Sequence, residues 1–360
     1  MRKRLLLIVM ASSLLLSGCG RILPNAKTAP IEQDSHFMYA RTHLDKKEKK
    51  DYDQIFNTLM DHKEKASIHA ASEAEIIKIF DSVLADHPEI FWTSEFRYQR
   101  DKEKKSNMIF YPVYAFDQSE IKDFNRQLKS ISKQIIQGID KNADDYEKVK
   151  YIYDFIINQT EYVDDAPNSQ NIISSLINKT SVCAGYAKAV QYLLAMLDID
   201  CAFITGKATE NNVSHAWNMV KMDDEYYYLD ATYADSDNGQ NVSDYRYIYF
   251  GMTSDEIAKL YNEMALHEIS NATADTYYMK NNCYFTSYDE EQVKQLVKDS
   301  VRTGNRSLLM KFDTAETMQS VHQQLTDQYR LFSILETNGI ALKNINFYMI
   351  PELHAILYFY

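Results

Sequence analysis

The chain has 360 residues, of which 45% are apolar and 25% charged, and this globular composition excludes a wholly disordered or fibrous protein. A formal net charge of −12 at pH 7 repels phosphate backbones, which argues against nucleic acid as a partner. Four cysteines are too few for a disulfide scaffold.

The N-terminus has the pattern of an export signal. Three basic side chains in the first four residues precede an apolar run that is too short to span a bilayer as a mature helix. The run ends in LSGC at residues 16–19, which resembles a bacterial lipobox, where the signal is cut before a cysteine that receives a diacylglyceryl chain. We therefore expect a lipoprotein signal peptide at residues 1–18, lipidation of Cys19, and a tether at residues 19–35. This predicts an exported protein held by its lipid on the outer face of the cytoplasmic membrane.

A small α+β domain is expected over residues 36–118. Apolar residues recur at helical spacing in two stretches, and Ser72 with Glu75 has the pattern of a capping box at the start of the second helix. An apolar strand is predicted at residues 107–116, where Pro112 suggests a sheet edge or a bulge.

Two further helices, near residues 119–139 and 144–158, open a core domain that we place at residues 119–250. A second small α+β domain is expected over residues 251–360. Its predicted strand, helix and terminal pair of strands lie near residues 306–312, 315–328, 345–350 and 354–360.

Cys183 stands at the start of an amphipathic helix in the core domain, and the next residues keep one buried stripe at helical spacing. Unpaired N–H groups and the positive end of the helix dipole favour the thiolate, which is the nucleophilic form. Gly185 would let neighbouring backbone approach this helix closely. Taken alone, a cysteine at a helix start is more often a small apolar residue than a nucleophile.

A β-hairpin is predicted downstream, with Asp223 and Asp224 at its tip. With the turn at these two residues, Trp217 lies opposite Asp230 on the neighbouring strand. His215 then lies on the same sheet face, about 7–8 Å from Asp230 along a diagonal. A carboxylate there could hold the imidazole in one tautomer and stabilise its charged form. An ordinary surface pair is the alternative. Because Asp230 ends a strand, we expect the fold to tolerate its replacement by asparagine.

Cys183, His215 and Asp230 together supply a nucleophile, a base and a group that orients the base. The segment around them resembles the bacterial transglutaminase-like superfamily over roughly residues 145–250. The motifs that carry this resemblance are VCAGYA at 182–187, SHAWN at 214–218 and YYLDATY at 227–233. The resemblance implies an α+β, papain-like core with the cysteine helix packed on an antiparallel sheet, and thiol-dependent acyl transfer.

Two residues depart from the family pattern: Tyr233 replaces the usual tryptophan, and Ala234 stands where an acid is common. We therefore expect the wall of the substrate site to differ from the family's. We expect the backbone amide of Cys183 to be one hydrogen-bond donor to the oxyanion. The candidate side chains for the oxyanion site or for the wall of the substrate site are Gln170, Trp217 and Tyr186. Trp217 is expected to pack near the Cys183 helix, whereas Asn218, on the opposite strand face, suits structural support.

The leading hypothesis is a membrane-anchored cysteine acyltransferase. It would form a thioester at Cys183 from a glutamine carboxamide or a peptide carbonyl and pass the acyl group to an amine. The alternatives are a cysteine protease or amidase of the same fold, and a non-catalytic surface module that binds cell-wall or host proteins. Cys201 and Cys283 are expected to be structural thiols, and whether they form a disulfide stays open. The spacing of Cys and His residues disfavours a zinc site, and no cofactor is predicted.

Overall fold

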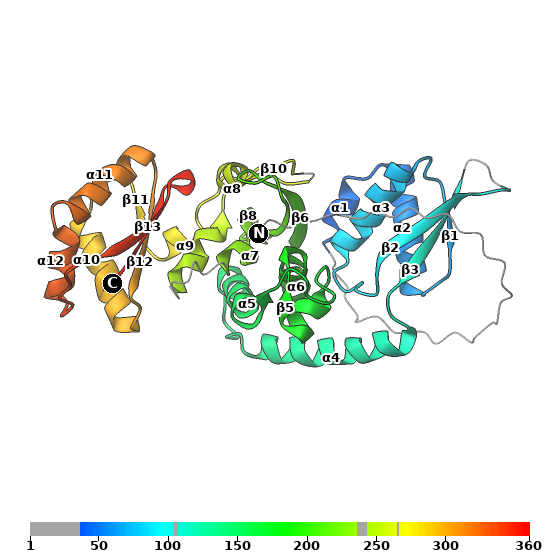
Figure 1. Ribbon diagram of the computed structural model, residues 1–360, viewed down its shortest axis with the longest axis horizontal. Coiled ribbons are helices and arrows are strands. Elements are labelled where there is room, and N and C mark those ends of the chain that lie inside the picture. Colours follow the sequence, from blue (N-terminus) through cyan, green and yellow to red (C-terminus); the bar gives the residue numbers. More distant parts are fainter. Residues whose placement is uncertain (1–36, 104–106, 236–242, 265) are drawn as a thin grey trace.

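The computed structural model describes residues 37–103, 107–235, 243–264 and 266–360, which form three units in a row (Figure 1). The expected signal peptide, Cys19 and the tether at 19–35 lie outside the described residues. Within the described part, the model contains no helix that is long and apolar enough to cross a membrane.

The N-terminal unit packs helices on a three-stranded antiparallel sheet with the strand order β1-β3-β2. The Ser72 side chain caps a helix by accepting a hydrogen bond from the Glu75 amide at 3.2 Å. The expected capping box is only half formed, because the Glu75 side chain accepts from the amide of Ala71 and not from that of Ser72. The elements are α1 (Tyr39–Thr42), α2 (Lys46–Met60), β1 (Ala66–Ile68), α3 (Glu73–Asp86), β2 (Thr93–Arg100) and β3 (Met108–Tyr114).

Pro112 lies on the central strand of this sheet, which corrects the expectation of an edge strand. Strand β1 pairs with β3 only as far as Phe110, whereas β2 runs alongside Pro112 itself. The missing N–H of the proline therefore costs no ladder hydrogen bond on the β1 side, where pairing has already ended. The expected bulge is found in the partner strand, between Thr93 and Glu95.

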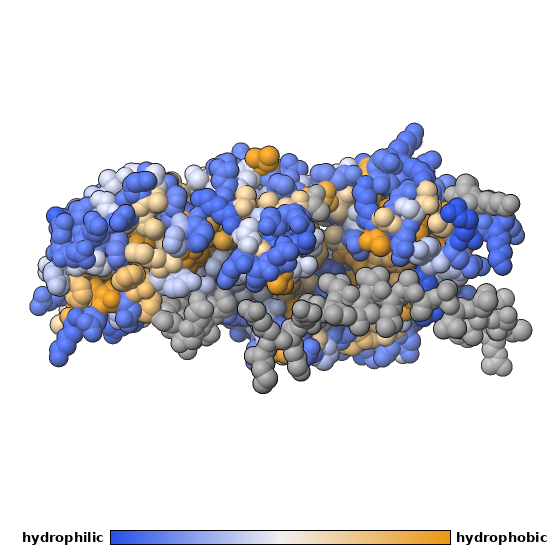
Figure 2. Space-filling model, turned by 45° about the horizontal axis from the view of Figure 1, so that its top comes forward, coloured by the Kyte–Doolittle hydropathy of each residue, from blue (hydrophilic) through white to orange (hydrophobic). Residues whose placement is uncertain are grey.

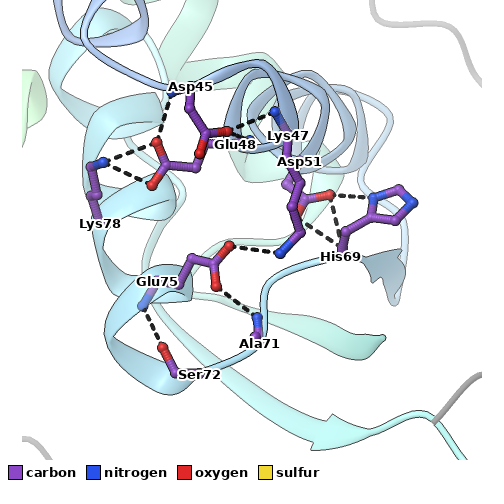
Figure 3. A network of polar contacts seen from close by, with 9 residues as sticks. All are labelled: Asp45, Lys47, Glu48, Asp51, His69, Ala71, Ser72, Glu75 and Lys78. Carbon is purple, nitrogen blue, oxygen red and sulfur yellow. Dashed lines mark hydrogen bonds and ion pairs between the residues drawn. The ribbon is translucent and has the colours of Figure 1, made fainter. Parts of the chain in front are cut away.

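Charged side chains tie α2 to α3 and to the end of β1 (Figure 3). Asp51, which is buried, accepts hydrogen bonds from the backbone amide of His69 and from its Nδ1 at 2.8 Å. Glu48 accepts from Lys78 with both carboxylate oxygens, at 2.7 and 2.9 Å. These hydrogen bonds compensate the carboxylates of Asp51 and Glu48 for the water that they lose on burial.

The core domain places a helical layer against a five-stranded antiparallel sheet with the strand order β10-β6-β7-β8-β9. The α+β fold class expected from the sequence is confirmed, with the helix that begins at Cys183 packed on an antiparallel sheet. The helices are α4 (Gln118–Gln137), α5 (Asp145–Gln159), α6 (Cys183–Ala195), α7 (Ala231–Ala234) and α8 (Ser254–Leu260), with a π-helix η1 (Ser174–Asn178) and a 3₁₀ helix η2 (Ser243–Tyr249). The strands of the main sheet are β6 (Cys201–Ala208), β7 (Ser214–Met222), β8 (Glu225–Leu229), β9 (Phe250–Met252) and β10 (Tyr261–Asn262), and β4 (Glu161–Tyr162) pairs in parallel with β5 (Thr180–Ser181).

The hairpin between β7 and β8 has the register predicted from its turn. Lys221 pairs with Tyr226 and Asn218 with Leu229. Asp223 and Asp224 both have positive φ, at 46° and 67°, as a two-residue hairpin turn of this twist requires.

The core sheet extends past the boundary that we expected at residue 250. Strands β9 and β10 form its two edges, so the core sheet runs to Asn262. Strands of three and two residues are too short to show a periodic pattern, and the sequence therefore gave no signal for them.

The C-terminal unit begins after α9 (Tyr277–Lys280) and has a four-stranded sheet with the order β11-β12-β14-β13. One face of this sheet packs on the core domain through Leu309 and Leu357, and the other face, with Met310 and Tyr358, packs in a separate hydrophobic cluster with the helices. Helices α10 and α12 were not predicted. The elements are β11 (Tyr284–Phe285), α10 (Glu290–Thr303), β12 (Ser307–Phe312), α11 (Ala315–Thr326), α12 (Arg330–Thr337), β13 (Asn346–Ile350), η3 (Pro351–Leu353) and β14 (Ala355–Phe359).

Hydrophilic residues cover most of the face shown in Figure 2, and hydrophobic residues form small patches between them. The exposed large apolar side chains include Ile77, Tyr162 and Phe347, one from each unit. Isolated apolar residues of this kind are normal on a protein surface and indicate no partner by themselves.

Candidate active site

Cys183 is the first residue of α6 and is partly exposed. The N-cap residue is Val182, which has no side-chain acceptor for the first amides of the helix. The positive end of the helix dipole is therefore not compensated by a capping side chain, and it acts on the thiol at the helix start.

Gly185 brings two other segments against the start of α6, as predicted. A Cβ atom at this position would lie 3.0 Å from the carbonyl oxygen of Ser169 and would collide with the hydroxyls of Ser174 and Ser181. Those two hydroxyls are 2.6 Å apart and hydrogen-bonded to each other. The glycine thus lets η1 and the loop before it fix the position of the cysteine.

His215, the second residue of β7, lies between a carboxylate and the thiol. Its Nε2 is hydrogen-bonded to Oδ2 of Asp230 at 2.7 Å, and its ring lies close enough to the Cys183 thiol for that group to help raise its pKa. Because Nε2 faces Asp230, Nδ1 is the nitrogen left for the thiol. The structure therefore brings together all three residues that the sequence singled out. Their catalytic roles stay a prediction.

The electrostatics of this cluster favour a charged imidazole. Burial by itself lowers the pKa of His215, but the negative charge of Asp230 and its hydrogen bond, together with the contact to Cys183, outweigh burial and raise the pKa to about 10. Burial acts to raise the pKa of Asp230, yet the charge and hydrogen bond of His215 leave it below its usual value. At neutral pH the pair is thus an imidazolium and a carboxylate.

Asp230 is fully buried, which corrects the expectation that it merely ends a hairpin strand. Its Oδ1 accepts from the amides of Thr232 and Tyr233 at 3.0 Å and so caps α7. Its Oδ2 accepts from Tyr261 as well as from His215. The chain turns into a short helix directly after β8, and this turn buries the carboxylate.

Trp217 is buried among other aromatic rings, which corrects the expectation that it forms a wall of the site. Its ring stacks on Tyr261 with centroids 4.2 Å apart, and only 1% of the residue is exposed. The neighbouring Asn218, on the other strand face, donates to the carbonyl oxygen of Ala187 in α6 at 2.9 Å. Asn218 thus supports the helix, as predicted, and Trp217 lies too deep to form an accessible wall.

Tyr186 is also buried rather than part of a wall. Its hydroxyl hydrogen-bonds with the carbonyl oxygen of Thr160 at 2.9 Å and with Oδ2 of Asp235 at 2.5 Å. Gln170, in contrast, is exposed, and it follows Ser169 in the loop that packs against the start of α6. Gln170 therefore stays a candidate donor to the oxyanion.

Two further tyrosines surround the thiol. Tyr162, 47% exposed, pairs across β4 and β5 with Ser181, and burial together with nearby Cys183 raises the pKa of its hydroxyl to about 12. The ring of Tyr233 meets the His215 ring edge-on, with centroids 5.0 Å apart. The substitution at Tyr233 was visible in the sequence, whereas nothing there indicated Tyr162.

The other described cysteines are distant from this chemistry. Cys201 and Cys283 are buried and both are free thiols, so the structure contains no disulfide between them. Over the described ranges, no group of three or more His, Cys, Asp or Glu side chains is arranged to hold a metal ion.

Comparisons with known proteins place the core domain in a family. Residues 130–231 match the model of the transglutaminase-like superfamily, a range that includes Cys183, His215 and Asp230. A search of curated proteins found no match.

Two solved structures are similar over part of the chain. One is a protein from Cytophaga hutchinsonii provisionally described as a cysteine protease, with 19% identity over 38% of this chain and a TM-score of 0.27. The other is described as a TGase, with 16% identity over 47% of this chain and a TM-score of 0.26. This chain spans 61% and 52% of the lengths of those two proteins. The family assignment therefore depends on the match of residues 130–231, which places this segment of the core domain in the transglutaminase-like superfamily.

Proposed function

We propose that this protein is a cysteine-dependent acyl transferase. Cys183 forms a thioester from a glutamine carboxamide or a peptide carbonyl, and an amine then takes the acyl group. The observation that carries this proposal is the arrangement of the three side chains. Asp230 holds Nε2 of His215, and the imidazole lies near the Cys183 thiol at an uncapped helix start.

Each half of the reaction moves one acyl group and one proton. In the first half, the sulfur of Cys183 bonds to the carbonyl carbon, the C–N bond breaks, and His215 gives its proton to the leaving ammonia or amine. In the second half, an amine attacks the thioester, the C–S bond breaks, and the imidazole accepts the proton of the amine. Asp230 stays ionised throughout and stabilises the imidazolium.

The negative charge on the carbonyl oxygen needs donors in both halves. The amide of Cys183 lies at the N-terminus of α6, where no side chain caps the helix. Backbone amides at a helix start are suited to bind an oxyanion. The exposed Gln170, from the adjoining loop, is the side-chain donor that we propose.

Hydrolysis is the second candidate, and the partial exposure of Cys183 favours it. A thioester that water can reach is cleaved by water as well as by amines, which would make the protein a protease or an amidase. In either case we propose that the substrates are proteins or peptides, including cell-wall or host proteins.

The proposal places this reaction outside the cytoplasm, on a membrane. It rests on the basic and apolar residues 1–18 and on the lipobox-like end at Cys19. A lipid at Cys19 would hold the core domain near the membrane surface through the tether at residues 19–35.

The test is incubation of the protein with a labelled primary amine and a glutamine-containing protein. Incorporation that is lost in Cys183→Ala, and kept in the matched control Cys201→Ala, supports transfer. Release of ammonia or of new peptide termini without incorporation assigns hydrolysis instead. If the wild type behaves like Cys183→Ala in every one of these assays, the non-catalytic binding module replaces both enzymatic proposals.

A further inference from the structure

Tyr261 reaches the catalytic cluster from outside the segment that matches the family. It lies on β10, which pairs with β6 so that Tyr261 is opposite Ala208. In the next pair of strands, Gly206 of β6 is opposite His215 of β7. Since side chains alternate along a strand, Tyr261, Gly206 and His215 share one face of the sheet.

The ring of Tyr261 lies flat against two rings of β7. It is stacked on His215 with centroids 5.2 Å apart and an interplanar angle of 15°, and on Trp217 at 4.2 Å and 18°. Stacking of this kind limits how far the imidazole can rotate about its side-chain bonds. Only 2% of Tyr261 is exposed, so the ring is itself held in place by packing.

Gly206 leaves the space that this stack needs. A Cβ atom there would lie 2.7 Å from the carbonyl oxygen of Asn262 and 2.8 Å from Cη2 of Trp217. Both contacts are closer than real Cβ atoms come to their neighbours, so a side chain at this position would push β10 away. The absence of a side chain opposite His215 therefore allows β10 to approach.

The hydroxyl of Tyr261 donates to Oδ2 of Asp230, the same oxygen that accepts from His215. Burial and the charge of Asp230 raise the pKa of Tyr261 well above its usual value, so the hydroxyl keeps its proton and stays a donor. One residue thus contacts both the imidazole and the carboxylate that orients it.

We propose that Tyr261 is a positioning residue of this active site: its ring fixes the plane of the His215 imidazole, and its hydroxyl fixes the carboxylate of Asp230. The inference rests on the proposed function for its catalytic meaning. The geometry is independent of which acyl acceptor the enzyme uses.

The hydroxyl and the ring act on the charge of His215 in opposite directions. Among the described residues, the groups that face the imidazole are the Asp230 carboxylate, the Cys183 thiol, and the rings of Trp217, Tyr233 and Tyr261. The Tyr261 hydroxyl proton competes with the imidazolium for Oδ2, so the hydroxyl disfavours the charged imidazole. The face of the tyrosine ring attracts that charge and so favours it.

The experiment compares Tyr261→Phe and Tyr261→Leu with Tyr228→Phe, and it titrates the ring of His215 by NMR in the absence of substrate. Tyr228 is a matched control, because it is a buried tyrosine of the same sheet whose hydroxyl donates at 2.5 Å to a backbone carbonyl away from the cluster. The histidine signal is assigned with His215→Asn. Thermal melts report the loss of stability that each variant suffers.

Tyr261→Phe is expected to raise the pKa of His215 by about half a unit. In Tyr261→Leu, the pKa of His215 should lie below its value in Tyr261→Phe by a similar amount. Turnover should fall about threefold in Tyr261→Phe and about tenfold or more in Tyr261→Leu, with an unchanged KM, since Tyr261 does not contact substrate. Tyr228→Phe should leave the His215 titration as in the wild type.

A His215 titration that is unchanged in both Tyr261 variants, or that shifts equally in Tyr228→Phe, would overturn the inference and leave Tyr261 a core residue. The titration needs no substrate, so the inference and the proposed function fail separately. If the shifts are found but no transfer or hydrolysis is detected with any substrate, the positioning of His215 stands and the enzymatic proposal falls.

Discussion

Asp230→Asn is the change that most directly tests the electrostatics of the active site. It removes the negative charge beside His215 and keeps almost the same volume. The cap on α7 should survive, because asparagine is as good an N-cap residue as aspartate. The variant therefore changes the charge and the tautomer of the imidazole more than it changes the fold.

The structure sets the size of the effect. The pKa of His215 is about 10, against 6.5 for a free histidine, and this difference is equivalent to about 5 kcal/mol in favour of the imidazolium. Without the carboxylate, burial lowers the pKa of His215 and the Cys183 thiol raises it. If the two effects balance at the ordinary value of about 6.5, about 3% of the molecules carry an imidazolium at pH 8. That alone is a loss of about 30-fold, and the wrong tautomer adds to it, so we expect turnover to fall by about 10²–10³.

The assay measures acyl transfer and the rate of Cys183 alkylation across pH 5–10 in the wild type, Asp230→Asn and Cys183→Ala. In the wild type, activity should decline on the alkaline side as His215 loses its proton near pH 10. In Asp230→Asn this decline should move down to about pH 6.5, because the pKa of His215 is no longer raised by the carboxylate. Full activity in Asp230→Asn beside an inactive Cys183→Ala would refute this reasoning and assign the orientation of His215 to another group.

The same shift predicts how stability depends on pH. The pKa of His215 is raised on folding, so its contribution to stability is fully present below pH 6.5 and is lost as the pH rises toward about 10. The pKa of Asp230 is lowered, so its contribution is present above its unfolded pKa and disappears as the pH falls through the folded value. Melting temperatures of the wild type and Asp230→Asn should therefore differ most near pH 6 and converge toward pH 10.

Three further predictions concern the anchor, the nucleophile and the packing of α6. Cys19→Ala should leave the protein unprocessed or release it from membranes, and unchanged fractionation and size of the mutant would contradict the lipoprotein assignment. Iodoacetamide near neutral pH should label Cys183 rapidly, whereas burial excludes the reagent from Cys201 and Cys283 and raises the pKa of both thiols. Equal labelling of the three cysteines by mass spectrometry would count against Cys183 as the nucleophile. Gly185→Ala should lower the free energy of unfolding by about 1–3 kcal/mol, because its methyl would overlap the neighbouring loop, and a denaturant titration matching the wild type would show that the loop yields at no cost.

The relative placement of His215 and Asp230 could be predicted because it is encoded locally. Two aspartates that adopt positive φ fix the hairpin turn, the turn fixes the register, and the register brings His215 and Asp230 to one face. The nature of the environment could not be predicted in the same way. Asp230 is buried by the helix that follows it, and a four-residue helix leaves no periodic pattern in a sequence.

Tyr261 marks the limit of what local patterns can predict. It lies 31 residues beyond Asp230, on a strand of two residues. A weak signal for its approach exists in Gly206, since a glycine inside a strand often marks a place where another backbone comes close. To predict that this glycine lies opposite His215, one needs the register of β6 against β7. The connection between these strands is an irregular loop rather than a two-residue turn, so it does not reveal that register. Local turn geometry thus places His215 beside Asp230. The residue that we propose to hold them in place depends on packing between distant segments, and only the folded chain shows it.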